Sequence, residues 1–219
     1  MVDPVEDLTD EGLEHAVAVL GRAFATDPMY AAFFPNPTTR AAGIDALNRA
    51  VLRMALRHGD VRVAGQGNAV AVWMRPGAPV RPISMIAAGV LGAARAVGVR
   101  DFVGFVAMDG TIEALRRRSA AGRHRHLLIL AVDPARQRSG LGKALLADGL
   151  ARAERERVAT WLETSVEANL GYYRGHGFEV AGTGTLGATR TPFWGMQRRP
   201  RDPAPNPAND SRAGRGTAV

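Results

Sequence analysis

The chain has 219 residues, of which 46% are hydrophobic and 22% are charged, and its formal net charge is +7. This length can bury one sizeable core, so we expect a single domain over residues 1–200. No apolar run is long enough to cross a bilayer, and the acidic N-terminus lacks the order of a secretory signal, so we expect a cytoplasmic protein. The absence of Cys excludes disulfides, thiolate metal sites and a cysteine nucleophile.

The net positive charge raises the question of nucleic-acid binding. Of the 28 basic residues, 27 are Arg and only Lys143 is Lys, a bias that with the frequent Ala and Gly indicates a GC-rich genome. The basic residues are also scattered, apart from residues 115–119 and the C-terminal end. We therefore expect no nucleic-acid partner, whereas attraction to a nucleotide phosphate agrees with the charge.

The first quarter of the chain predicts two amphipathic helices. Residues 8–24 have apolar side chains at helical spacing and Thr9 as the expected N-cap. Residues 38–59 form the second helix, which we expect to end at Gly59.

Residues 27–37, between these helices, contain three prolines and predict an irregular segment rich in aromatic side chains. Two interpretations are open. The aromatics form a hydrophobic plug over the core, or they form one wall of a substrate pocket. The second interpretation makes Tyr30, Phe33 and Phe34 candidate substrate contacts.

The middle of the chain predicts a β-hairpin, two helices and a buried strand. The hairpin strands are residues 61–64 and 68–75, joined by a Gly-Gln-Gly-Asn turn. Residues 84–98 and 110–120 predict helices, the first interrupted by Gly. The apolar run at 126–132 predicts a strand that is buried on both faces and ends at an Asp-Pro pair.

The last third predicts alternating helices and strands followed by a tail. The elements are a helix at 143–158, a strand at 159–165, a short helix at 169–177 and a strand pair at 178–186 and 192–199. Residues 201–219 are rich in Pro, Ala and Arg and have almost no large apolar side chain, so we expect a disordered tail.

A glycine loop, residues 137–142 (Gln-Arg-Ser-Gly-Leu-Gly), lies between the buried strand and the following helix. Such a loop can be a simple turn, or it can present backbone N–H groups and the helix dipole to an anion. Gly140 and Gly142 would let the main chain approach a pyrophosphate, and Arg138 and Lys143 add positive charge. The loop fits neither the dinucleotide fingerprint nor a P-loop.

The segment "LAVDPARQRSGLGKALL" resembles the acetyl-CoA-binding segment of the GNAT superfamily of N-acetyltransferases. Gln137, Gly140 and Gly142 fill the fixed positions of its signature, while Arg138 stands where the family usually has Gly. A second block, "LETSVEANLGYYRGHGFEV", resembles the family's later motif, and its pattern is most similar to puromycin-type N-acetyltransferases. The matching residues of the second block are Asn169, Tyr173, Gly177 and Phe178.

The resemblance implies an α/β (α+β) fold with a mixed, mostly antiparallel sheet flanked by helices and with splayed central strands that bind acyl-CoA. It also implies direct attack of a primary amine on acetyl-CoA, without a covalent enzyme intermediate or a metal. Antibiotic resistance is one role that such an activity would serve. The residues implied for acetyl-CoA binding are Leu130, Ala131, Val132, Gln137, Arg138, Ser139, Gly140, Leu141, Gly142, Lys143 and Asn169.

The reaction needs a base for the amine, a donor for the oxyanion and an acid for the leaving thiolate. The resemblance assigns the acid to Tyr173 and the oxyanion donor to a backbone N–H on the strand that ends at Val132. Glu163 is the candidate base, since it shares a strand face with Trp161, although a solvated Glu or a water relay is the alternative.

The acceptor is less defined than the cofactor. His124 and His126 precede the central strand and are candidates for lining the acceptor site. We expect a small amine as the acceptor, with a protein lysine or N-terminus as the alternative, and a homodimer is compatible with the sequence. A non-catalytic CoA-binding module is the alternative from another class.

Overall fold

The computed structural model describes residues 3–78 and 91–201. Within them, a seven-stranded sheet has the order β1-β2-β3-β4-β5-β7-β6 and is antiparallel except between β4 and β5. This confirms the expected mixed, mostly antiparallel α/β fold. The strands are β1 (Glu6–Asp7), β2 (Gly59–Ala64), β3 (Ala69–Met74), β4 (His124–Val132), β5 (Ala159–Thr164), β6 (Glu179–Leu186) and β7 (Thr191–Arg198).

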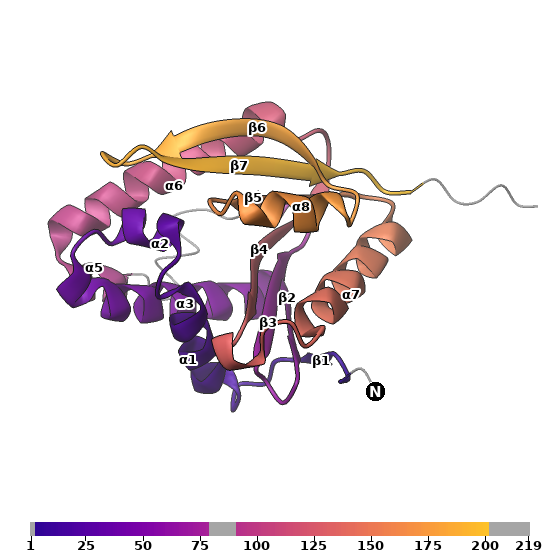
Figure 1. Ribbon diagram of the computed structural model, residues 1–219, viewed down its shortest axis with the longest axis horizontal. Coiled ribbons are helices and arrows are strands. Elements are labelled where there is room, and N and C mark those ends of the chain that lie inside the picture. Colours follow the sequence, from indigo (N-terminus) through magenta and orange to yellow (C-terminus); the bar gives the residue numbers. More distant parts are fainter. Residues whose placement is uncertain (1–2, 79–90, 202–219) are drawn as a thin grey trace, which may run out of the picture.

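Helices cover both faces of the sheet (Figure 1). The helices are α1 (Leu13–Phe24), α2 (Pro28–Phe33), α3 (Pro37–His58), α5 (Leu91–Val97), α6 (Val99–Ser119), the short 3-10 helix η1 (Pro134–Arg136), α7 (Leu141–Glu156) and α8 (Ala168–Arg174). The first five pack on one face, which we call the α6 face, and α7 and α8 pack on the other, the α7 face. The buried hydrophobic residues therefore form two clusters, one on each side of the sheet.

Strand β3 shows how the sequence divides its side chains between the two faces. Val70, Val72 and Met74 join the cluster on the α6 face, whereas Ala71 and Trp73 join the cluster on the α7 face. All of these side chains are buried, because alternate residues of a strand point to opposite faces and helices cover both. The predicted hairpin of β2 and β3 is confirmed.

The parallel contact between β4 and β5 covers only the first part of β4. The pairing runs from His124 with Ala159 to Leu127 with Leu162. Beyond that point β4 continues to Val132 beside β3, and a register shift against β3 leaves Leu128 as the extra residue of a bulge. The two central strands therefore part after Leu127, as the resemblance implied.

Residues 27–37 are not irregular, which corrects the expectation from their three prolines. Pro28 opens α2 and Pro37 opens α3, positions at which a missing N–H costs no helical hydrogen bond. The Asp27 side chain caps α2 by accepting hydrogen bonds from the backbone N–H groups of Met29 and Tyr30, at 2.8 and 3.2 Å. Three prolines in a short segment are typical of irregular structure, but an Asp-Pro pair is also a helix start.

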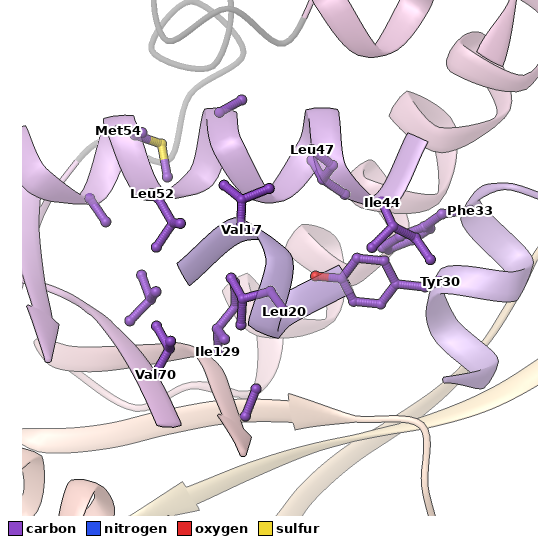
Figure 2. Packing of buried hydrophobic residues seen from close by; sticks show 14 of the residues in the cluster. Val17, Leu20, Tyr30, Phe33, Ile44, Leu47, Leu52, Met54, Val70 and Ile129 are labelled. Atoms are coloured by element: carbon purple, nitrogen blue, oxygen red, sulfur yellow. The ribbon is translucent and has the colours of Figure 1, made fainter. Parts of the chain in front are cut away.

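The aromatic side chains of this segment lie in the hydrophobic core. Tyr30, Phe33 and Phe34 are 9%, 6% and 0% exposed, and Figure 2 shows Tyr30 and Phe33 beside Ile44 of α3. The Tyr30 hydroxyl donates a hydrogen bond of 2.7 Å to the Asn48 side chain. These contacts agree with the interpretation as a hydrophobic plug.

Two helix boundaries differ from the sequence-based expectation. Helix α1 begins at Leu13, and Thr9 is not its N-cap, because the preceding Gly12 takes that position and the Thr9 carbonyl accepts from the Gly12 N–H in a turn. Helix α6 begins at Val99, eleven residues before the predicted start at 110. Its first turns expose Val99, Val103 and Val106, so they carry no amphipathic pattern.

Part of the expected architecture lies outside the described residues. This applies to residues 84–90 of one predicted helix and to 202–219 of the predicted tail. Arg201, the first residue of that tail, donates its backbone N–H to Glu154 at 2.7 Å. Among the described helices, none is both long and apolar enough to cross a membrane.

Gly149 of α7 packs against the fully buried indole of Trp73, and a Cβ at this position would lie 2.1–2.4 Å from three ring atoms. We expect Gly149→Ala to lower the free energy of unfolding by about 1–3 kcal/mol, because the rigid ring must move. Gly104→Ala is the control, since a Cβ there meets no described atom within 4 Å and should stabilise α6 by about 0.5–1 kcal/mol. Urea unfolding of both variants measures the difference, and equal stabilities would contradict this packing.

Candidate active site

The site begins where β4 ends and the chain turns into η1. Asp133 caps this turn by accepting from the Ala135 N–H at 3.0 Å. Its other carboxylate oxygen accepts two hydrogen bonds from Arg22 of α1, at 2.5 and 2.9 Å. The Arg22 guanidinium holds the pKa of the Asp133 carboxyl below its usual value. These bonds fix the start of the glycine loop relative to α1.

The glycine loop delivers the N-terminus of α7 without a side-chain cap. Gly140 occupies the N-cap position in the left-handed conformation, with φ of 88°, and no side chain bonds to the first turn. Arg138 is also left-handed, with φ of 61°, a conformation that glycine adopts more readily than other residues. Because the first N–H groups of a helix have no partner within it, this end can bind an anion.

The predicted cofactor residues gather around this loop. Gln137, Arg138, Ser139 and Gly140 are exposed, while Leu130 and Val132 of β4 are half-buried against the cluster on the α7 face. Ala131, Leu141, Gly142 and Lys143 continue the same surface from β4 into α7, with Ala131 and Leu141 buried beneath it. The loop is thus accessible, and its floor is apolar.

Gly142 and Tyr172 lie at the same edge of the site. A Cβ on Gly142 would meet Val132 at 3.4 Å and the Tyr172 hydroxyl at 3.9 Å. Tyr172 is 38% exposed, and its ring contacts that of Tyr173 edge-on at 5.3 Å. The hydroxyl of Tyr172 therefore lies beside the glycine loop.

Tyr173 is buried on the α7 face, where its ring packs edge-on against Phe178 at 5.8 Å between centroids. Within the described part of the chain, its hydroxyl forms no hydrogen bond to another residue. Burial raises the pKa of the Tyr173 hydroxyl, and the nearby Tyr172 and Asp27 raise it further. The hydroxyl therefore stays protonated at neutral pH and is able to donate.

Asn169 lies at the start of α8, where its side-chain amide donates to the Thr164 hydroxyl at 3.4 Å. This contact joins α8 to the end of β5, just beyond the point where β4 and β5 separate. The predicted cofactor residue Asn169 is thus held beside the gap between the strands.

Glu163 lies on the α6 face of β5, and both of its carboxylate oxygens have donors. Trp161 Nε1–H donates to Oε1 at 2.5 Å, and His126 Nε2 contacts Oε2 at 2.6 Å. The side chains of His126 and Glu163 are each 8% exposed. The structure thus brings together the candidate base and one of the two candidate histidines.

His124 has partners for both ring nitrogens. Its Nδ1 lies 3.0 Å from the Gly122 carbonyl and its Nε2 lies 3.1 Å from Arg116 Nη1. Because arginine can only donate, Nε2 accepts and Nδ1–H donates. Partial burial lowers the pKa of His124, which agrees with this neutral form.

Two carboxylates on the α6 face of the site were not predicted from the sequence. Asp27 accepts a hydrogen bond from Ser165 at 3.5 Å while it caps α2, and burial raises its pKa. Asp109 of α6 exposes more than a third of its surface. Its pKa is nevertheless raised to about 6, first because the surrounding chain partly desolvates the carboxylate, and then because the negative charges of Glu113 and Glu163 lie nearby. The Asp-Pro pair at 27–28 signals a helix start, but no sequence pattern places Asp109 beside β5.

Comparison with known proteins agrees with this geometry. Residues 93–180, which hold β4, the glycine loop, α7, β5 and α8, match the model of the acetyltransferase (GNAT) domain. The chain is similar to a Corynebacterium glutamicum structure described as histone acetyltransferase HPA2 and related acetyltransferase, with 25% identity, a TM-score of 0.69, and coverage of 93% of this chain and 99% of that one.

Two more distant structures share the fold. The mosquito protein arylalkylamine N-acetyltransferase like 5b has 13% identity and a TM-score of 0.57, and the match covers 90% of this chain and 99% of that chain. The Escherichia coli ribosomal-protein-S18-alanine N-acetyltransferase has 18% identity and a TM-score of 0.50, covering 93% and 97%. These two structures show the shared fold, whereas the match to the acetyltransferase (GNAT) domain is confined to residues 93–180.

The matched segment and the similarity to the Corynebacterium glutamicum structure both indicate acetyl transfer, the activity that is proposed below. Among the described residues, no group of three or more His, Asp or Glu side chains is arranged to hold a metal ion.

Gly142→Asp should abolish the stabilisation that acetyl-CoA gives the protein against heat. The added carboxylate would place a negative charge at the helix end where phosphate is expected. Gly142→Ala is the control, because its methyl group meets Val132 at 3.4 Å, an ordinary contact distance, and adds no charge. Thermal unfolding with and without acetyl-CoA measures the effect, and a normal shift in folded Gly142→Asp would remove the glycine loop from the cofactor site.

Proposed function

We propose that this chain transfers the acetyl group of acetyl-CoA to a primary amine of a small molecule, within a ternary complex. The observation that carries this proposal is the uncapped N-terminus of α7 beside the gap between β4 and β5. The helix end suits a pyrophosphate, and the gap exposes strand N–H and carbonyl groups to an extended ligand.

The cofactor would lie along the surface formed by β4, the glycine loop and α7. Backbone N–H groups from 138–143 would bind the pyrophosphate, with Arg138 and Lys143 adding positive charge. Leu130 and Val132, half-buried, would contact the pantetheine arm, and Asn169 would hold its far side from α8. Leu130, Ala131 and Val132 also supply the strand from which an N–H would bind the oxyanion.

The reaction forms one bond and breaks another. The amine nitrogen attacks the thioester carbon, the new C–N bond forms, and the C–S bond breaks to release CoA. One proton leaves the amine for a base, and the thiolate takes one from the Tyr173 hydroxyl. Burial, Tyr172 and Asp27 raise the pKa of Tyr173, so the hydroxyl is protonated at neutral pH and has a proton to give.

A small acceptor is supported by the way helices cover the α6 face. Helix α2 contacts both α6 and β7 above this face, which argues against a long open groove for an extended peptide. The carboxylates of Asp27 and Asp109 on the same side favour an acceptor with a positive charge. The buried aromatics Tyr30, Phe33 and Phe34 give no support to an acceptor pocket, because they form part of the core.

The acceptor proposal is tested by the release of free CoA thiol from acetyl-CoA with spermidine, phenylethylamine and a lysine-containing tripeptide. We expect turnover with one of the small amines and little with the tripeptide. Preference for the tripeptide would favour a protein acceptor, including a lysine or an N-terminus. Acetyl-CoA binding without thiol release in the presence of any of the three amines would favour a non-catalytic CoA-binding module.

Four expectations from the sequence stay predictions: a puromycin-type subfamily with a role in antibiotic resistance, a cytoplasmic location, a homodimer, and a single domain over 1–200 followed by a disordered tail. None of them is needed for the proposed chemistry.

Tyr173→Phe should lower kcat by about 10²–10⁴-fold, because it removes the proton donor and keeps the ring in its packing against Phe178. The affinity for acetyl-CoA should change little. Tyr172→Phe is the matched control one residue away. Since its hydroxyl lies beside Gly142, its loss should act on KM for acetyl-CoA more than on kcat.

Steady-state kinetics of both variants, with the chemical step shown to limit the rate, provide the measurement. Full activity in folded Tyr173→Phe would exclude Tyr173 as the acid. A larger loss of kcat in Tyr172→Phe would move that role to the neighbouring tyrosine.

A further inference from the structure

His126 is a buried histidine with one occupied nitrogen and one unoccupied nitrogen. Its Nε2 lies 2.6 Å from Glu163 Oε2. Its Nδ1 is buried and has no hydrogen-bond partner among the described residues. A purely structural His–Glu pair would be expected to satisfy both nitrogens, because an unpaired buried polar atom costs free energy.

The tautomer follows from the contact with Glu163. The carboxylate accepts a hydrogen bond, so Nε2 carries a proton, and in neutral imidazole Nδ1 then has a free lone pair. Glu163 itself is a poor candidate for taking a proton directly, since Trp161 and His126 already occupy its two oxygens. The free basic atom of this cluster is therefore Nδ1 of His126.

The pair lies at the point where the cofactor gap begins. His126 is opposite Trp161 in the parallel pairing, Leu127 with Leu162 is the last pair, and Glu163 follows directly. Both side chains are on the α6 face, opposite the α7 face that holds Tyr173. A thioester in the gap would thus have the tyrosine on one side and the imidazole on the other.

We propose that His126 is the general base, taking the proton of the acceptor amine at Nδ1 either directly or through one water molecule, and that Glu163 is its positioning residue. As the amine nitrogen bonds to the thioester carbon, its proton passes to Nδ1. Tyr173 gives its proton to the departing thiolate. After product release, the imidazolium and the phenolate return to their neutral forms by exchanging a proton with water. This role rests on the proposed acetyl transfer.

Other titratable groups lie near the pair, and their effects on a pH profile must be distinguished from that of His126. Asp109 of α6 and His124 of the same strand interact electrostatically with both members of the pair, and Glu113 and Arg116 of α6 interact with Asp109. Asp109 is the main competitor, because its pKa is raised to about 6. The variant Asp109→Asn is therefore included as a control in every pH profile.

The experiment compares His126→Gln, Glu163→Gln and Asp109→Asn, using whichever of spermidine, phenylethylamine and the lysine tripeptide reacts fastest. Gln at 126 can still donate to Glu163, but it cannot take a proton. His58→Ala, at the end of α3, controls for loss of an imidazole, because strand β3 separates the neighbouring Gly59 of β2 from His126 of β4. Acetyl-CoA-dependent thermal stabilisation shows that each variant is folded and binds the cofactor.

We expect His126→Gln to lower kcat by about 10²–10⁴-fold. We also expect its profile of kcat/KM against pH to lose the acid limb, which is the fall in kcat/KM at low pH. Glu163→Gln should lose less activity and keep that limb, as should Asp109→Asn, while His58→Ala should match the unaltered enzyme. An acid limb that persists in folded His126→Gln would overturn the assignment, and its loss in Glu163→Gln would make Glu163 the base.

The experiment distinguishes a failure of the proposed acetyl transfer from a failure of the proposed role of His126. No thiol release by the unaltered enzyme with any of the three amines would remove the proposed acetyl transfer, and the role of His126 with it. Thiol release that is unchanged in His126→Gln would remove the role of His126 alone.

Discussion

The structure depends on the short parallel pairing between β4 and β5. This pairing holds the two halves of the sheet together from His124 to Leu127, and then it stops. Backbone N–H and carbonyl groups of β4 that would have bonded to β5 are left facing a gap, and strand groups in a folded protein require partners. A ligand with its own amide groups, such as the pantetheine arm of acetyl-CoA, can supply those partners, which is why we propose the gap as the cofactor site.

The remaining elements position chemical groups around this gap. Arg22 fixes Asp133, which fixes the turn into the glycine loop, and the uncapped end of α7 follows, where we propose that the phosphates bind. Asn169 joins α8 to the end of β5, and thereby places Tyr173 on the α7 face. His126 and Glu163 occupy the opposite face. The two proposed proton-transfer groups thus come from different elements, on either side of the same pair of strands.

The sequence predicted the parts of this arrangement that are local. The apolar run of β4, the glycine loop and the α7 helix are contiguous, so their order and chemistry could be recognised directly. The expected irregular segment at 27–37 was wrong, because two prolines begin helices there and Asp27 caps the first. The contact between His126 and Glu163 joins residues 37 positions apart, and it depends on strand register that local patterns do not determine. Asp109 lies in α6, where exposed valines disrupt the amphipathic pattern that would have predicted a helix from the sequence.

Amide hydrogen exchange with and without acetyl-CoA tests the central claim most directly, because it reports on the backbone groups that the gap exposes. We expect the cofactor to slow exchange in 128–132 of β4 and in 138–143 of the glycine loop. Little change is expected in β6, at the edge of the sheet and away from the gap. Protection confined to segments other than β4 and the loop, in protein that acetyl-CoA demonstrably stabilises, would contradict the account.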